Sequence, residues 1–134
     1  MNNKTIILIL LIAMFSCNHS KLTMITKKQI GGYFLGQKLD EEHDKNIFDI
    51  QTDKNNLITS VIVSDKNYRT KEGFGVGTNM DSIKQHFKKY AENDIPFSKG
   101  STYIGSFGTV LVCKKIAFID GNDDKIIDYV WIEI

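Results

Sequence analysis

Two side chains that could form a nucleophilic pair, Cys113 and His86, occur in the C-terminal half of this sequence. A cysteine–histidine dyad needs the thiol at the surface beside the imidazole. Cys113 instead lies within the β-rich run 109–119, where a cysteine most often packs as a small buried hydrophobe. We therefore expect Cys113 to be buried and unreactive. With no serine-centred nucleophile motif and no carboxylate pair in the sequence, we expect no enzymatic activity.

Oxygen side chains alternate in the segment 120–124, at Asp120, Asn122 and Asp124. This spacing matches the first ligands of a calcium loop, but Lys125 replaces the glycine of the sharp turn, and Trp131 occupies the position of the final glutamate. A turn is therefore the favoured interpretation. A calcium-binding or ligand-binding sensor is the less favoured alternative, and we expect neither a metal nor a cofactor.

Two other polar or glycine-rich segments have simpler interpretations than binding. His43 lies in the acidic run 40–44 without a second histidine or cysteine at ligand spacing nearby, so an exposed loop residue is expected. The glycines of Gly73–Gly77 precede an expected helix, but their spacing matches neither of the standard phosphate-binding loops. We expect these glycines to supply positive φ angles in a tight turn.

Four aromatic residues lie in glycine-rich segments rather than in regular apolar patterns. Such residues could be exposed and form a partner-binding surface, although packing in the core is the other interpretation. The four candidate binding residues are Phe74, Phe97, Tyr103 and Phe107.

The surrounding pattern predicts an α+β fold, an antiparallel β-sheet with one main amphipathic helix packed on one face. The segments 46–51 and 57–63 are expected to form a hairpin joined by 52–56. The helix is expected over 79–91, capped by Thr78, with a capping box completed by Asp81. Its apolar face would contain Met80, Ile83, Phe87, Tyr90 and Ala91. Further strands are expected at 101–105, 109–113, 116–120 and 126–134, the last two joined as a hairpin.

The first 16 residues have the form of an export signal. Lys4 precedes an apolar run at 6–15, which is shorter than the roughly 20 residues of a membrane span. The segment Met14-Phe15-Ser16-Cys17 resembles a lipobox. This resemblance implies that Cys17 becomes the first mature residue and carries a diacylglyceryl group on its thiol and an acyl chain on its amine. Because Asn18 rather than aspartate follows, we expect an outer-membrane anchor facing the periplasm.

The expected organisation is a signal peptide at 1–16, a lipidated N-terminus and flexible tether at 17–28, and a single domain at 29–134. The whole chain contains 17 basic and 16 acidic residues, and removal of the leader with Lys4 makes it formally neutral. This balance argues against nucleic-acid binding. The membrane contact is expected to come from the N-terminal lipid.

A wider resemblance lies in the pattern Tyr68-x-Thr70-x-x-Gly73-x-x-Val76-Gly77-Thr78, followed by the expected helix. Over residues 57–90 the chain is similar to small bacterial envelope lipoproteins of uncharacterised function. Its order of elements is similar to that of outer-membrane assembly lipoproteins and β-lactamase-inhibitory proteins. The resemblance implies binding of another envelope protein and no catalytic residues. An assembly or scaffold partner is expected, and an inhibitor or immunity protein that neutralises an envelope-acting enzyme is the alternative.

The substitution Cys17→Ala tests the predicted anchor. It removes the thiol that would carry the lipid, so we expect an unprocessed, unlipidated precursor on immunoblots of fractionated cells. Normal maturation and continued membrane attachment of the variant would contradict the prediction.

Overall fold

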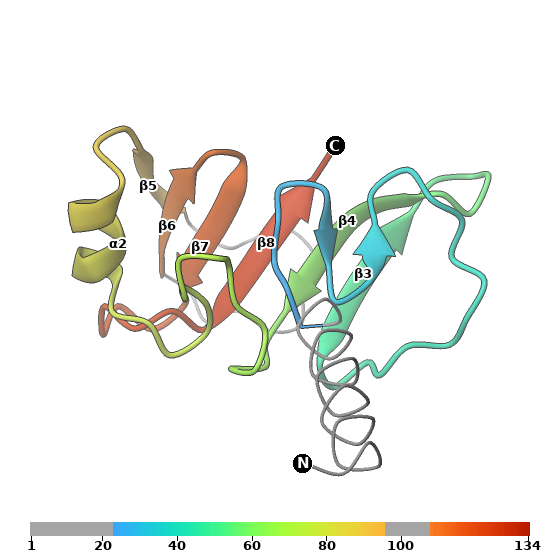
Figure 1. The fold of residues 1–134 in the computed structure, drawn as a ribbon, viewed down its shortest axis with the longest axis horizontal. Coiled ribbons are helices and arrows are strands. Elements are labelled where there is room, and N and C mark those ends of the chain that lie inside the picture. The colour runs from blue at the N-terminus through green and yellow to red at the C-terminus, as the bar shows by residue number, and fades with distance from the viewer. Residues whose placement is uncertain (1–22, 96–107) are drawn as a thin grey trace, which may run out of the picture.

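Antiparallel pairing joins six strands of the described chain into one sheet. The computed structural model describes residues 23–95 and 108–134. The strands of the sheet are β3 (Phe48–Thr52), β4 (Ile58–Val63), β5 (Ala91–Ile95), β6 (Gly108–Cys113), β7 (Ile116–Asp120) and β8 (Tyr129–Glu133). Their spatial order is β3-β4-β8-β7-β6-β5, so β8 joins the β3–β4 hairpin to the other three strands (Figure 1). Within the described residues there is one helix, α2 (Met80–His86). The predicted α+β class with an antiparallel sheet is confirmed.

The expected hairpin at 46–63 forms as β3 and β4. Asp53 organises the turn because its carboxylate accepts hydrogen bonds from the N–H groups of Asn55 (2.8 Å) and Leu57 (3.0 Å). The second expected hairpin also forms, since β7 and β8 are antiparallel neighbours. However, β8 begins at Tyr129 rather than at residue 126. The strand expected at 101–105 lies outside the described residues.

The helix is shorter than expected and has a different cap. It ends at His86, and Asn79 is the N-cap, accepting a hydrogen bond of 2.8 Å from the N–H of Asp81. The predicted cap, Thr78, was wrong, because its hydroxyl accepts hydrogen bonds from Arg69 and from the N–H of Gly75 instead.

Strand pairing explains why the helix does not reach residue 91. Ala91 is the first residue of β5 and lies opposite Val112 of β6. The expected apolar face is therefore correct only in part: Met80 and Ile83 are buried, whereas Tyr90 is 43% exposed beyond the helix. Pairing with β6 at the edge of the sheet gives the backbone N–H and C=O groups of residues 91–95 partners in a neighbouring strand. Another helical turn would give them partners only within the same short helix.

The folded domain begins earlier than the predicted boundary at residue 29. Ile25 is only 2% exposed and belongs to the hydrophobic core. Its N–H donates to the carbonyl of Arg69 (2.8 Å), and the N–H of Arg69 donates to the carbonyl of Thr23 (3.0 Å). Residues 23–28 are therefore part of the domain. The polar residues Thr26, Lys27 and Lys28 that follow Ile25 conceal this core residue in the sequence.

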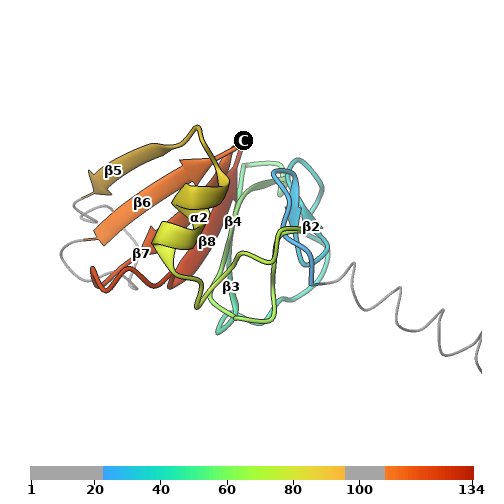
Figure 2. The ribbon, with the colours of Figure 1, turned by 60° about the vertical axis from the view of Figure 1, so that its left-hand side comes forward.

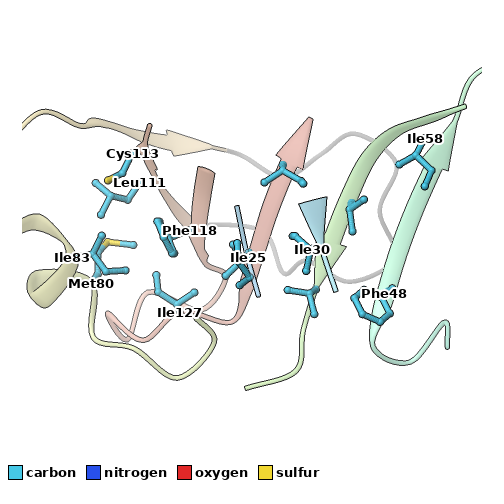
Figure 3. Packing of buried hydrophobic residues seen from close by; sticks show 14 residues of the cluster. Ile25, Ile30, Phe48, Ile58, Met80, Ile83, Leu111, Cys113, Phe118 and Ile127 are labelled. Atoms are coloured by element: carbon cyan, nitrogen blue, oxygen red, sulfur yellow. The ribbon is translucent and has the colours of Figure 1, made fainter. Parts of the chain in front are cut away.

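One face of the sheet carries the main core. The helix α2 covers its β5–β6–β7 side, and the N-terminal two-stranded sheet, β1 (Gln29–Ile30) and β2 (Tyr33–Phe34), covers the β3–β4–β8 side (Figure 2). Figure 3 shows buried side chains from both covering segments meeting those of the large sheet. The fully enclosed residues include Ile25, Ile30, Ile83, Leu111, Phe118, Ile127, Val130 and Ile132.

The Arg69 side chain holds together the glycine-rich segment that leads to α2. Its Nε donates to the carbonyl of Lys66 (2.9 Å), and Nη2 donates to that of Val76 (3.0 Å). Nη1 donates to the Thr78 hydroxyl (2.9 Å) and the Gly73 carbonyl (3.2 Å). The loop closes so tightly that a Cβ at position 75 would collide with the carbonyl oxygen of Tyr68.

We predict that Arg69→Lys lowers the free energy of unfolding by about 2 kcal/mol, because one ammonium group cannot replace the planar fork that serves four acceptors. Urea denaturation of the full chain would measure the change. The matched control is Lys71→Ala at an exposed neighbouring position, for which we expect a change within about 0.5 kcal/mol. Equal midpoints for Arg69→Lys and wild type would contradict the prediction.

Candidate functional site

The structure places Cys113 on the core face, with 1% of its surface exposed. Burial raises the pKa of its thiol to about 11, so the thiolate required for nucleophilic attack is scarce at neutral pH. His86 is exposed and packs edge-on against Phe74 and Phe87, at centroid distances of 5.3 Å and 4.9 Å. These surroundings support the interpretation of Cys113 as a core residue.

The oxygen side chains of the 120–124 loop accept hydrogen bonds from the loop's own backbone. Asp120 is 1% exposed, and its carboxylate accepts from the N–H groups of Asn122, Asp124 and Lys125 at 2.7–3.3 Å. Asn122 and Asp124 each accept from the backbone N–H two positions further on. The loop is therefore an Asp-centred turn. Within residues 23–95 and 108–134, no group of three potential metal ligands clusters together.

The remaining segments considered for binding have structural roles. Gly73 and Gly77 adopt φ angles of 87° and 85°, as expected for a turn that a Cβ would strain. His43 is half-buried and packs edge-on against Tyr33 at 6.2 Å, rather than being a fully exposed loop residue. A hollow of ≈ 540 Å³ beside it is lined mainly by the charged side chains of 40–42 and Lys45.

The proposed aromatic surface receives little support at its one described member. Phe74 is half-buried, packs against the main core and contacts Phe87 edge-on at 5.9 Å. The other three candidates, Phe97, Tyr103 and Phe107, lie outside the described residues. So does the predicted lipid-attachment residue, Cys17.

A feature not identified from the sequence is the second face of the sheet, opposite α2, which is apolar as well. Antiparallel sheets commonly have one buried and one polar face. Here direct cross-strand partners on the second face form one row, in which Val112 lies opposite Ala117, and Ala117 lies opposite Trp131. The neighbouring row contains Val110, Ile119 and Tyr129. A second, smaller hydrophobic cluster results.

The second face is closed at its centre and hollowed toward the end that carries the β6–β7 turn. Val110 and Ile119 are buried, at 2% and 1% exposure. Beyond them lies a groove of ≈ 360 Å³. Its lining residues are Asn93, Val110, Val112, Lys115, Ala117, Trp131, Glu133 and Ile134. We call this hollow the Ala117 groove.

The small side chain of Ala117 explains the depth of the groove. It lies between the larger side chains of Val112 and Trp131 in the same cross-strand row, so the surface is lower at this point. The indole N–H of Trp131 donates to the Ser60 hydroxyl at 2.8 Å. This bond satisfies the polar group of the indole, so the ring presents an apolar wall.

The chemistry of the Ala117 groove suits binding. Its walls are valine, alanine and tryptophan, and an amide and two opposite charges stand at the rim on Asn93, Lys115 and Glu133. Among the described residues, the lining includes no cysteine, histidine or serine that could act as a nucleophile or base. The sequence signal for this groove was that β6, β7 and β8 are apolar at most successive positions, which places apolar side chains on both faces of the sheet.

We predict that Cys113 in the folded chain resists alkylation at pH 8, because the pKa of about 11 leaves little thiolate and burial blocks access. Iodoacetamide labelling followed by mass spectrometry would measure it. We expect labelling at least about 100-fold slower than in urea-unfolded protein. Rapid native labelling of Cys113 would contradict its placement in the core.

No family model, curated protein or solved structure matches this chain. Residues 23–95 and 108–134 contain no helix with the length and apolar character of a membrane span. The functional interpretation therefore rests on the sequence and on the geometry of the described residues.

Proposed function

We propose that this protein is a non-enzymatic binding module, lipid-anchored through Cys17 in the bacterial cell envelope, that docks another envelope protein in the Ala117 groove. The lipobox-like segment ending at Cys17 supports the anchor. The observation that carries the docking role is the hollow between Val112 and Trp131 on a sheet face that would ordinarily be polar.

The partner presents a large apolar side chain, which fills the groove as an anchor. The volume of ≈ 360 Å³ lies at the small end of the range of roughly 300–1,000 Å³ for ligand pockets. Interfaces often gain most of their affinity from a few such anchors in desolvated pockets surrounded by a polar rim. The rim groups on Asn93, Lys115 and Glu133 are placed to bond the partner's backbone and flanking polar side chains.

A photo-crosslinking residue at Asn93 tests this docking site. Asn93 is exposed at the groove rim, so benzoylphenylalanine there lies close to a bound partner. In intact cells expressing the full-length lipoprotein, we expect a discrete protein adduct after irradiation. The same probe at Lys54, which is exposed in the β3–β4 turn, serves as the positional control and should give no such adduct.

Filling the groove should abolish the adduct. Ala117→Leu adds bulk where the floor is lowest, whereas Ala117→Ser nearly preserves its volume and serves as the matched control. We expect the Asn93 adduct to fall at least about tenfold in the leucine variant and to persist in the serine variant. Thermal melts would establish that both variants fold. Absence of any wild-type adduct, or an equal yield from folded Ala117→Leu, would overturn the proposal.

A further inference from the structure

Four exposed lysines gather where α2 leads into β5 and where β6 turns into β7. Lys88 and Lys89 lie in the first connection, and Lys114 and Lys115 form the second. We call these four residues the basic corner. Both connections lie at the same end of the sheet (Figure 1).

Strand register and a ring contact bring the two connections together. Ala91 lies opposite Val112, so the residues just before β5 run beside the turn that follows β6. The Nζ of Lys114 lies 5.5 Å from the ring centroid of Phe87, the residue directly before Lys88. Tyr90, which is 43% exposed, lies in the same connection.

The positive charge of the basic corner is not compensated by an ion pair among the described residues. The ion pairs found among the described residues involve three other lysines, Lys38, Lys84 and Lys125. Glu92, at the start of β5, is held by Lys84 at 2.7 Å. In the part of the chain that the structure describes, Glu133 is the one acidic side chain that lines the Ala117 groove together with Lys115. Like charges gathered on one surface create a potential that attracts acidic ligands.

The backbone of the β6–β7 turn makes lysine an unexpected choice there. Cys113 pairs with Ile116, which leaves a two-residue turn in which Lys114 and Lys115 have φ angles of 49° and 67°. Such turns favour asparagine and glycine. Two lysines in left-handed conformations therefore carry backbone strain, which is common at functional positions.

We infer that the basic corner binds carboxylate groups of the same partner that fills the Ala117 groove, so that the partner is an acidic protein segment with an apolar anchor. This inference rests on the proposed function. Lys115 connects the two surfaces because it belongs to the corner and also lines the groove.

The direction in which the basic corner faces favours a protein, rather than the anchoring membrane, as its ligand. The first described residues, which follow closely after Cys17, lie away from the corner in both views (Figures 1 and 2). In the proposed function the lipid on Cys17 precedes Thr23 by only a few residues, which places the N-terminal side of the domain nearer the membrane. The corner therefore faces away from the surface to which the chain is tethered.

Neutralising the corner tests this inference. In the full-length chain with benzoylphenylalanine at Asn93, we compare the triple variant Lys88→Gln, Lys89→Gln, Lys114→Gln with a control triple, Lys27→Gln, Lys54→Gln, Lys66→Gln. The control lysines are exposed and remove the same charge elsewhere. We expect the partner adduct in isolated membranes to fall about tenfold in the corner variant and to change little in the control. Raising salt from about 0.05 M to about 0.5 M should weaken the wild-type adduct.

A second probe at Tyr90 identifies what touches the corner. We expect benzoylphenylalanine there to capture the same partner as the Asn93 probe. A phospholipid adduct without a protein adduct, or no adduct from Tyr90, would overturn the inference. So would an Asn93 adduct that is unaffected in the corner variant. Failure of the docking proposal itself is distinguishable, because the wild-type Asn93 probe would then capture nothing.

Discussion

Arg69 connects the parts of the molecule that cover the main core. Its backbone pairs with residues 23 and 25, which places Ile25 in the core. Its side chain donates to three carbonyl groups and one hydroxyl of the segment 66–78, and this fixes where α2 begins. Because a planar fork can serve several acceptors at once, one residue sets the positions of the N-terminal segment and of the helix on the same face of the sheet.

The N-terminal segment and α2 lie on one face of the sheet, but the opposite face is apolar as well, with Val110 and Ile119 buried there. Side chains alternate along a strand, so the valines, alanine and tryptophan at alternate positions of β6, β7 and β8 must lie opposite the core. The small size of Ala117 between two larger neighbours then creates a hollow. The uncompensated lysines nearby concentrate positive charge locally on a chain whose formal net charge is only +1. Local distribution, rather than net charge, therefore gives this end of the molecule a positive potential.

Strong local patterns were predictable from the sequence. The α+β class and the hairpins at 48–63 and 116–133 follow from β-rich segments joined by Asp, Asn and Gly turns. The helix ended early, because pairing of Ala91 with Val112 depends on a strand far along the chain. Arg69 was not identified, since its acceptors are backbone atoms with no sequence signature. The groove was missed because it depends on which residues of separate strands become direct partners.

Trp131 is the only tryptophan of the chain and forms a wall of the Ala117 groove, which allows a direct test of the central claim. Full-length protein labelled with 5-fluorotryptophan would give one ¹⁹F resonance from the folded chain, measured alone and with solubilised envelope membranes from cells that lack the protein. We predict that the resonance shifts and loses its solvent isotope effect when the membranes are added, and that folded Ala117→Leu shows no such change. An unchanged wild-type resonance would contradict the claim that a partner occupies the groove.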